Sequence, residues 1–335
     1  MANRSNKRWL FVALVVVQTI IFGSGNAITK MAYDSITPLW CLAIRFGLAT
    51  LVFGALFGPR IVRRLRCVRM RDWLPAAACM ALAYIACNVA LDLTTATNVG
   101  FLVALPVVFA PLLSSIVGRC RYPRAFLPFQ AAVVGGLYLL CCNGGSFSMG
   151  WGEVLALLSS VALAGALVFG EQGLKRLDPI SVAGTQIAAS FALSLACAVF
   201  LEPPVDLAAV TPFSWGTIAF LAVLSTCLTF ALQNASLTVL KSSTVSLLLT
   251  GEPVFTAVFS WMLLGETLAV GGLAGAALIV AAVAAATALE GRAGRASAPK
   301  PASAEARPAP AIATVELPRA AAAPEGPALA SERAA

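Results

Sequence analysis

The feature that most constrains this chain is a succession of apolar runs, each close to 20 residues long and separated by short polar breaks. A helix of about 20 residues rises about 30 Å, which is the thickness of the hydrocarbon core of a bilayer. Hydrophobic residues make up 59% of the chain and charged residues only 11%, whereas soluble domains carry roughly 25% charged residues. The sequence therefore predicts an all-α polytopic membrane protein.

Ten such runs are present, and they predict ten transmembrane helices. They span residues 9–28, 38–58, 73–91, 96–117, 126–143, 152–170, 180–200, 213–236, 243–264 and 268–289. The breaks at residues 92–95 and 265–267 are very short, and losing either would reduce the count to nine. The first run is too long for the apolar core of a cleavable signal peptide, so we expect it to remain as the first helix.

Basic residues test this count independently, because cytoplasmic loops hold an excess of Lys and Arg. Of the 23 basic residues, 21 lie in the N-terminal segment, the C-terminal tail and every second loop between them. The opposite loops hold only Lys30, and Arg45 lies inside the second run. We therefore expect both termini in the cytoplasm and interpret the net charge of +8 as a topology signal, with no nucleic-acid partner.

The domain boundaries follow from an internal repeat. An offset of 147 residues aligns Phe22-Gly23 with Phe169-Gly170 and Pro106-Val107 with Pro253-Val254, and an offset of 146 aligns Asn88 with Asn234. We predict a five-helix repeat over residues 9–143 and a second over residues 152–290. Because five is odd, the second copy enters the bilayer from the opposite side, so the repeats are inverted, as in many secondary transporters.

Two terminal segments lie outside the repeats. Residues 1–8 form the predicted cytoplasmic N-terminus. Residues 291–335 are rich in Ala and Pro and poor in large apolar side chains, which predicts a disordered cytoplasmic tail.

Several motifs resemble EamA-type members of the drug/metabolite transporter superfamily. They are Phe22 to Asn26 with Lys30, Pro38 followed by Arg45, Thr97 to Phe109, and Gly251 to Phe255 continuing through Gly265-Glu266. The resemblance covers residues 9–290. It implies a ten-helix fold, a central cavity formed mainly by helices 1 to 4 and 6 to 9, and transport of amino acids or related metabolites, often outward.

Two ionisable residues inside the predicted spans are functional candidates, because a charge inside the bilayer is costly. Arg45 could hold a substrate carboxylate with its fork of donors, and Glu252 could take up a coupling proton or bind a substrate ammonium group. In the structural alternative, Glu252 and Arg45 neutralise each other, or Glu252 orders the backbone freed by Pro253.

Polar residues provide further candidate contacts for a substrate. Asn88 and Asn234 occupy matching places in the two repeats, and Gln186 is the neutral counterpart of Arg45; the asparagines could equally join neighbouring helices. Asn26 belongs to the first motif. Lys30 lies just beyond the first helix, and both it and Glu266 are equally well explained as snorkelling or capping residues.

Pro106 and Pro253 each remove a helix hydrogen bond and predict kinks that line the transport pathway. Gly271 and Gly275 form a small-xxx-small pair that allows close helix packing, within the chain or in a homodimer.

Other classes of function lack support in the sequence. There is no histidine, no spaced cysteine cluster in a loop and no phosphate-binding loop of the Walker type, so we expect no metal, no cofactor and no enzymatic or ATP-driven activity. The leading expectation is a cell (inner) membrane carrier that exports an amino acid or derivative by alternating access, with proton coupling or down the solute's own gradient. The alternatives are an uptake carrier, a drug or nucleotide-sugar exchanger, and a channel or receptor.

Overall fold

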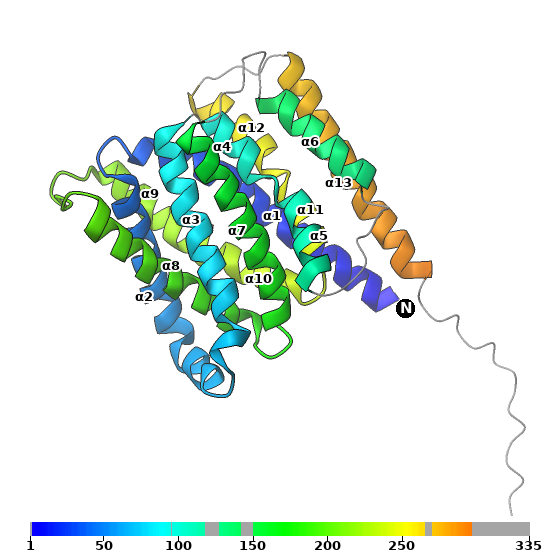
Figure 1. The fold of residues 1–335 in the computed structure, drawn as a ribbon, viewed down its shortest axis with the longest axis horizontal. Coiled ribbons are helices and arrows are strands. Elements are labelled where there is room, and N and C mark those ends of the chain that lie inside the picture. Colours follow the sequence, from blue (N-terminus) through cyan, green and yellow to red (C-terminus); the bar gives the residue numbers. More distant parts are fainter. Residues whose placement is uncertain (1, 95, 118–126, 142–149, 265–269, 297–335) are drawn as a thin grey trace, which may run out of the picture. The chain divides into compact units, whose positions relative to one another are not determined.

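The computed structural model describes residues 2–94, 96–117, 127–141, 150–264 and 270–296, and these form helices and turns without a β-strand. Figure 1 shows the helices packed side by side. The chain divides into a compact unit, Met1–Arg292, and a second unit, Ala293–Ala335.

The helices of the first predicted repeat are α1 (Ala2–Ala32), α2 (Pro38–Leu65), the short η1 (Met70–Asp72), α3 (Leu74–Leu93), α4 (Ala96–Val103), α5 (Pro106–Val117) and α6 (Leu127–Cys141). Those of the second are α7 (Trp151–Gly173), α8 (Pro179–Leu201), α9 (Pro212–Ala222), the π-helical η3 (Val223–Leu228), α10 (Thr229–Leu237), α11 (Ser242–Leu249), α12 (Glu252–Leu264) and α13 (Val270–Ala296).

Six helical stretches in the described part of the chain are long and apolar enough to cross a membrane. They are Trp9–Lys30, Pro38–Leu65, Leu74–Leu93, Trp151–Gly173, Pro179–Leu201 and Pro212–Leu237. The last of these comprises α9, η3 and α10. Shorter apolar helices occupy Pro106–Val117, Leu127–Leu139 and Val270–Ala286.

The fourth predicted helix of each repeat is broken, which corrects the expectation of one continuous helix over 96–117 and another over 243–264. A turn separates α4 from α5 immediately before Pro106, and a turn at Thr250-Gly251 separates α11 from α12 immediately before Glu252-Pro253. Proline has no N–H and fits best in the first turn of a helix. Each proline therefore lies in the first turn of a new helix here, where the sequence predicted a kink.

The outer ends of the bundle also differ from the predicted boundaries. Helix α1 begins at Ala2, before the expected start at residue 9, and α13 continues to Ala296, beyond the expected end at residue 289. The predicted break at residues 265–267 lies outside the described residues.

Helices α2 and α8 are the second helices of the two repeats, and they pack antiparallel with polar contacts at both ends. At one end, the Glu202 carboxylate that follows α8 accepts hydrogen bonds from the Thr37 hydroxyl (2.5 Å) and from the backbone N–H groups of Leu39 (3.0 Å) and Trp40 (3.1 Å). A carboxylate in this position satisfies the free N–H groups of a helix N-terminus and complements its dipole. Glu202 thus caps α2 from the other repeat.

The opposite ends of the same two helices are joined by charge. Asp178 precedes α8 and forms an ion pair with Arg60 near the end of α2, with 2.8 Å between Oδ2 and Nη2. Arg64 lies 3.9 Å from the other carboxylate oxygen. The end of α2 therefore supplies counter-charges to the start of α8, as the end of α8 supplies the cap of α2.

Two further pairs of helices are antiparallel in a matching way. In α3 and α7, a Cβ atom at Gly152 would touch Thr94, the Ser159 hydroxyl donates to the carbonyl of Ala83 (2.7 Å), and a Cβ atom at Gly173 would touch Asp72. In α1 and the stretch α9–α10, Ser236 donates to the carbonyl of Phe11 (3.5 Å), Gln18 contacts Gln233 (2.8 Å), and Ser35 contacts Ser214 (2.8 Å).

These contacts relate the first helix of each repeat to the third helix of the other, in opposite directions. The contacts α1–α12 and α5–α7 form a second reciprocal set. In each, the first helix of one repeat packs against one part of the broken fourth helix of the other repeat. Such reciprocal contacts are what a two-fold relation between inverted repeats generates.

The antiparallel packing sorts charge toward the ends of the helices. Basic residues gather where α2 and α7 end and α3, α8 and α11 begin; they are Arg60, Arg63, Arg64, Arg66, Arg69, Arg71, Lys175, Arg176 and Lys241. We call this the basic end. The opposite end carries Lys30 together with the acidic residues Asp34, Asp92, Glu153, Glu202 and Asp206. The distribution is the one expected of a protein with its basic end in the cytoplasm.

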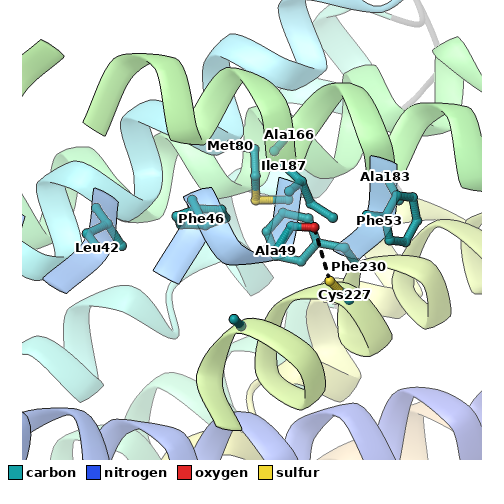
Figure 2. Close-up of a cluster of buried hydrophobic side chains, with 11 residues drawn as sticks. Leu42, Phe46, Ala49, Phe53, Met80, Ala166, Ala183, Ile187, Cys227 and Phe230 are labelled. Carbon is teal, nitrogen blue, oxygen red and sulfur yellow. Dashed lines mark hydrogen bonds between the residues drawn. The ribbon is translucent and has the colours of Figure 1, made fainter. Parts of the chain in front are cut away.

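The largest buried apolar cluster lies where the two repeats meet (Figure 2). It includes Phe46 and Phe53 of α2, Met80 of α3, Ile187 of α8 and Phe230 of α10. Elsewhere, α6 lies along α13 (Figure 1), and a Cβ atom at Gly136 would lie 2.9 Å from the carbonyl oxygen of Gly275. The predicted glycine pair of α13 therefore packs within the chain at Gly275, and the homodimer stays a prediction.

Candidate functional site

Arg45 is buried in α2, about 10 Å from the N-terminal end of the helix by its seven-residue distance from Pro38. Its Nε donates to the Thr226 hydroxyl (2.8 Å), and its Nη2 donates to the carbonyl oxygen (3.0 Å) and hydroxyl (3.2 Å) of Ser225. The hydrogen-bond acceptors of Arg45 among the described residues are thus neutral groups of the other repeat.

The partners of Arg45 lie in the π-helical segment η3. A π-helix shifts the backbone bonds to i→i+5 and often occurs at functional sites. Ser225 and Thr226 lie in the middle of η3, and the carbonyl of Ser225 accepts a second bond from the Thr229 hydroxyl (3.0 Å). On the α1 side, a Cβ atom at Gly25 would lie 3.2 Å from the Ser225 hydroxyl, so α1 packs directly against this segment.

Aromatic rings surround the other side of the guanidinium group. Its central carbon lies 5.6 Å from the centroid of the Phe46 ring and 5.4 Å from that of Tyr84. Such distances allow cation–π attraction, which is stronger in a desolvated site. Phe46 contacts Tyr84 edge-on, with centroids 5.1 Å apart, and Phe230 completes the group at 5.6 Å from Tyr84.

Asn88 is buried in α3 and joins this aromatic group to the turn after α1. Its Nδ2 donates to the carbonyl of Tyr84 (2.8 Å), and its Oδ1 accepts from the Tyr33 hydroxyl (2.5 Å). Burial raises the pKa of Tyr33 well above its ordinary value. The Tyr33 phenol therefore stays protonated and can act as the donor.

Asn234 repeats the first of these contacts in the other half of the chain. Its Nδ2 donates to the carbonyl of Phe230 (2.9 Å), four residues earlier, as Asn88 does to Tyr84. The same Nδ2 also donates to Gln186 Oε1 (2.7 Å). The structure thus brings two of the predicted site residues, Asn234 and Gln186, into direct contact.

A second buried amide pair lies one residue away along α10. Gln18 of α1 donates from Nε2 to Oε1 of Gln233 (2.8 Å), and both side chains are at most 1% exposed. Four atoms of the two amide pairs make no hydrogen bond among the described residues: Gln18 Oε1, Gln233 Nε2, Asn234 Oδ1 and Gln186 Nε2. We call Gln18, Gln186, Gln233 and Asn234 the amide cluster. It presents unused donors and acceptors away from bulk solvent.

Glu252 begins α12 and is half-buried, which corrects its expected place in the middle of a continuous helix. Helix α1 crosses this turn in close backbone contact. A Cβ atom at Gly23 would lie 2.6 Å from Phe255 Cβ and 3.1 Å from the carbonyl oxygen of Glu252. Glu252 is thus placed at the junction of the first helix and the broken fourth helix of the other repeat.

The two prolines lie in equivalent breaks. Pro106 is buried at the start of α5, and the nearby carbonyl of Val107 accepts from Nε2 of Gln130 in α6 (2.8 Å). Pro253 is buried in the first turn of α12.

The remaining predicted site residues are less informative. Lys30 is exposed in the last turn of α1, as a snorkelling residue would be. Asn26 lies in α1, but its side chain is outside the described part, and so is Glu266 altogether. No group of three or more potential metal ligands occurs among the described residues.

Sequence reasoning missed Gln18, Gln233, Ser225, Thr226 and Tyr84. The two glutamines carried a signal, because an amide inside an apolar run is uncommon in a membrane helix. Ser225, Thr226 and Thr229 form a hydroxyl-rich stretch in the eighth run, but nothing in that spacing predicts a π-helix.

Comparisons with known proteins add the family context. The model of the EamA-like transporter family matches residues 9–141 and again residues 150–288. An uncharacterized transporter of Archaeoglobus fulgidus is 30% identical over 269 residues, which cover 79% of this chain and 81% of the relative. A solved structure titled only "Crystal structure of protein" has 20% sequence identity and a TM-score of 0.71, and the match covers 84% of this chain and 98% of that one.

Proposed function

This chain belongs to the EamA-like transporter family, and from that membership we propose that it is a secondary carrier exporting an amino acid or an amino-acid derivative. The proposal includes ten membrane spans in two inverted five-helix repeats, with both termini in the cytoplasm and the protein in the cell (inner) membrane. The antiparallel pairs α2–α8, α3–α7 and α1–α10 support the inversion, and the basic end supports the orientation.

The buried positive charge of Arg45 is the main observation that supports a substrate with a carboxylate group. Burying a cation is unfavourable unless a partner compensates for it, yet the hydrogen bonds of Arg45 go to hydroxyl and carbonyl groups of Ser225 and Thr226. These bonds use Nε and Nη2, and we propose that Nη1 donates to the substrate. A carboxylate is the planar anion that a guanidinium fork binds best.

The amide cluster supports the same substrate class. Four of its atoms make no hydrogen bond in the part of the chain that the structure describes. Of these, the carbonyl oxygens of Gln18 and Asn234 can accept from an ammonium group or an amide, and the nitrogens of Gln186 and Gln233 can donate. Contacts connect it to Arg45 through Phe230 and Tyr84, whose rings are tilted against each other. An amino acid offers both an anion for Arg45 and donors for the amides.

Proton coupling is the part of the proposal that rests on Glu252. It lies at the contact of α1 with α12, where protonation changes the charge between two helices that belong to different repeats. Two inverted repeats can rock between related states around a site at their interface. A carboxylate at such a junction can therefore couple proton binding to the exchange of states.

A counterflow experiment tests the proposal. Purified protein is reconstituted into proteoliposomes loaded with a mixture of amino acids, and the uptake of single radiolabelled amino acids is followed. We expect saturable uptake that is stimulated by unlabelled substrate on the other side. Flux without saturation or counterflow would indicate a channel, and no flux for any carboxylate, amine, drug or nucleotide sugar would favour a receptor.

The coupling is tested with Glu252→Gln against Asp206→Asn, which removes a carboxylate from an exposed loop. We expect Glu252→Gln to abolish the pH dependence of uptake while Asp206→Asn retains it. An unchanged pH profile in Glu252→Gln would contradict proton coupling through Glu252, and the carrier would then be driven by the solute gradient alone.

A further inference from the structure

A second polar site lies away from the contact of Arg45 with η3, at the basic end of the bundle. A cavity of about 190 Å³ lies between the start of α3 and the end of α7. Its lining residues are Arg71, Asp72, Pro75, Phe169, Gln172, Lys175 and Arg176. Typical pockets for small organic ligands measure about 300 to 1,000 Å³, so this cavity suits a compact group.

The charges of the lining favour an anion. Arg71, Lys175 and Arg176 are basic, and the one carboxylate, Asp72, is already engaged. Its Oδ2 lies 3.3 Å from Nη1 of Arg176 and accepts from the backbone N–H of Arg69 at 3.3 Å. The positive charges of Arg71 and Lys175 are therefore in excess.

The helix dipoles do not decide the charge preference. Pro75 places the positive N-terminal end of α3 beside the cavity, and Phe169 and Gln172 place the negative C-terminal end of α7 there as well. These two ends offset one another. Selection for an anion thus depends on the basic side chains and on the Gln172 amide.

The surroundings indicate that the anion comes from the bilayer. Trp73 precedes α3, and its ring type is enriched at the level of lipid headgroups. Met70 and Leu74 flank Arg71 and Pro75 in sequence and are 67% and 44% exposed. Exposed apolar side chains next to a basic cavity suit an amphipathic ligand with acyl chains and an anionic head.

We propose that this cavity binds the phosphate group of an anionic phospholipid from the leaflet at the basic end. Arg71, Lys175 and Arg176 contact the phosphate, and Gln172 donates to it. The acyl chains lie against the exposed side chains of Met70 in η1 and Leu74 in α3. Basic pockets between membrane helices on the cytoplasmic side are known to recognise anionic headgroups. The site is separate from the proposed transport site, so either can fail without the other.

The test uses the full chain in detergent, with lipid binding followed by native mass spectrometry. Phosphatidylglycerol and phosphatidylcholine of equal chain length are titrated into wild type, into Arg71→Gln/Lys175→Gln, and into the control Arg63→Gln/Arg66→Gln. The control removes the same charge from exposed residues of the basic end that do not line the cavity. Melting temperatures confirm that each variant is folded.

We expect wild type to prefer phosphatidylglycerol, the cavity variant to lose about 10-fold or more of that affinity, and the control to lose less than about 3-fold, given the energy of each basic contact. Equal losses of affinity for phosphatidylglycerol in both variants would show that the lipid is attracted by the overall charge of the basic end, which would contradict a specific site in the cavity. Inorganic phosphate and glycerol phosphate are titrated in parallel as water-soluble ligands. If either bound the cavity as tightly as phosphatidylglycerol, the lipid would not be the ligand.

Discussion

Arg45 presents the central question at the residue scale, because a charged group is buried among neutral partners. Hydroxyls, a carbonyl oxygen and two aromatic faces lower the free energy of the cation without neutralising it. An anionic substrate would complete the set of partners. The proposed carrier therefore predicts that the guanidinium group matters for affinity as well as for folding.

Arg45→Ala should abolish saturable uptake of carboxylate substrates, and Arg45→Lys should weaken their affinity by about 10-fold, because an ammonium group cannot reproduce the planar fork. The measurement is the concentration dependence of counterflow, with melting temperature as a check on folding. Arg63→Lys, at an exposed position of the basic end, is the control and should transport normally. Unaltered affinity in folded Arg45→Ala would assign Arg45 a purely structural role.

The amide pair of Gln18 and Gln233 makes a separate prediction about stability. Gln18→Met or Gln233→Met removes one partner and leaves the other amide buried without it, which should lower the free energy of unfolding by about 0.6 to 1.7 kcal/mol. In the double variant no orphaned partner remains, so part of this loss should be recovered.

Unfolding in mixed micelles of increasing denaturing detergent measures all four proteins of this double-mutant cycle. Strictly additive losses would mean that the two glutamines do not interact. A double variant at least as stable as wild type that has also lost uptake would assign the pair to substrate binding.

The sequence predicted which residues are buried and polar better than it predicted their partners. Arg45, Asn88, Asn234 and Gln186 were identifiable because each interrupts an apolar run. The partners of Arg45 were not, since Ser225 and Thr226 lie in η3, whose π-helical geometry has no sequence signal. A local change in helix period leaves no mark on hydrophobic periodicity.

At the scale of elements, the breaks before Pro106 and Pro253 are the main departure from the predicted helices. The apolar runs predicted the six stretches of the described chain that are long and apolar enough to cross a membrane, since apolar length is set by the bilayer. They could not distinguish a kinked helix from two helices. That outcome depends on whether neighbouring residues satisfy the backbone groups that a proline leaves without a partner. Inside α5, Gln130 does this for the carbonyl of Val107, whose i+4 residue is Pro111.

Close contact of α1 with α12 gives a prediction at this scale. Gly23→Ala would place a Cβ atom 2.6 Å from Phe255 Cβ, so the helices must separate, at a loss of about 1 to 3 kcal/mol in the free energy of unfolding. Gly54→Ala in α2 is the matched control, because a Cβ atom there meets nothing within 4 Å. The control should be neutral or stabilised by up to about 1 kcal/mol, since alanine favours helix.

Both glycine variants are compared by melting temperature and by counterflow. If Gly23→Ala were as stable and as active as Gly54→Ala, α1 and α12 would not pack as tightly as the structure has them.

At the scale of the whole molecule, the antiparallel contacts predict which segments share a side of the membrane. Native Cys67 follows α2 and is exposed at the basic end, and Lys175 follows α7 at the same end. Asp206 follows α8 at the opposite end and is also exposed. Single-cysteine proteins carrying Cys67, Lys175→Cys or Asp206→Cys allow each position to be tested separately.

With a membrane-impermeant maleimide added to intact cells, Asp206→Cys should be labelled at once. The Cys67 and Lys175→Cys proteins should be labelled only after permeabilisation, because basic loops stay in the cytoplasm. Labelling of Cys67 and position 175 from different sides would contradict the inverted arrangement.

Glu202 closes the first turn of α2 although it is encoded more than 160 residues later. During synthesis, α2 is therefore made before the carboxylate that accepts from its first backbone N–H groups. Those groups can bind Glu202 only after α8 has been made. The first repeat on its own consequently lacks the cap of its second helix. We expect this helix end to reach its final packing only after the second repeat has been synthesised.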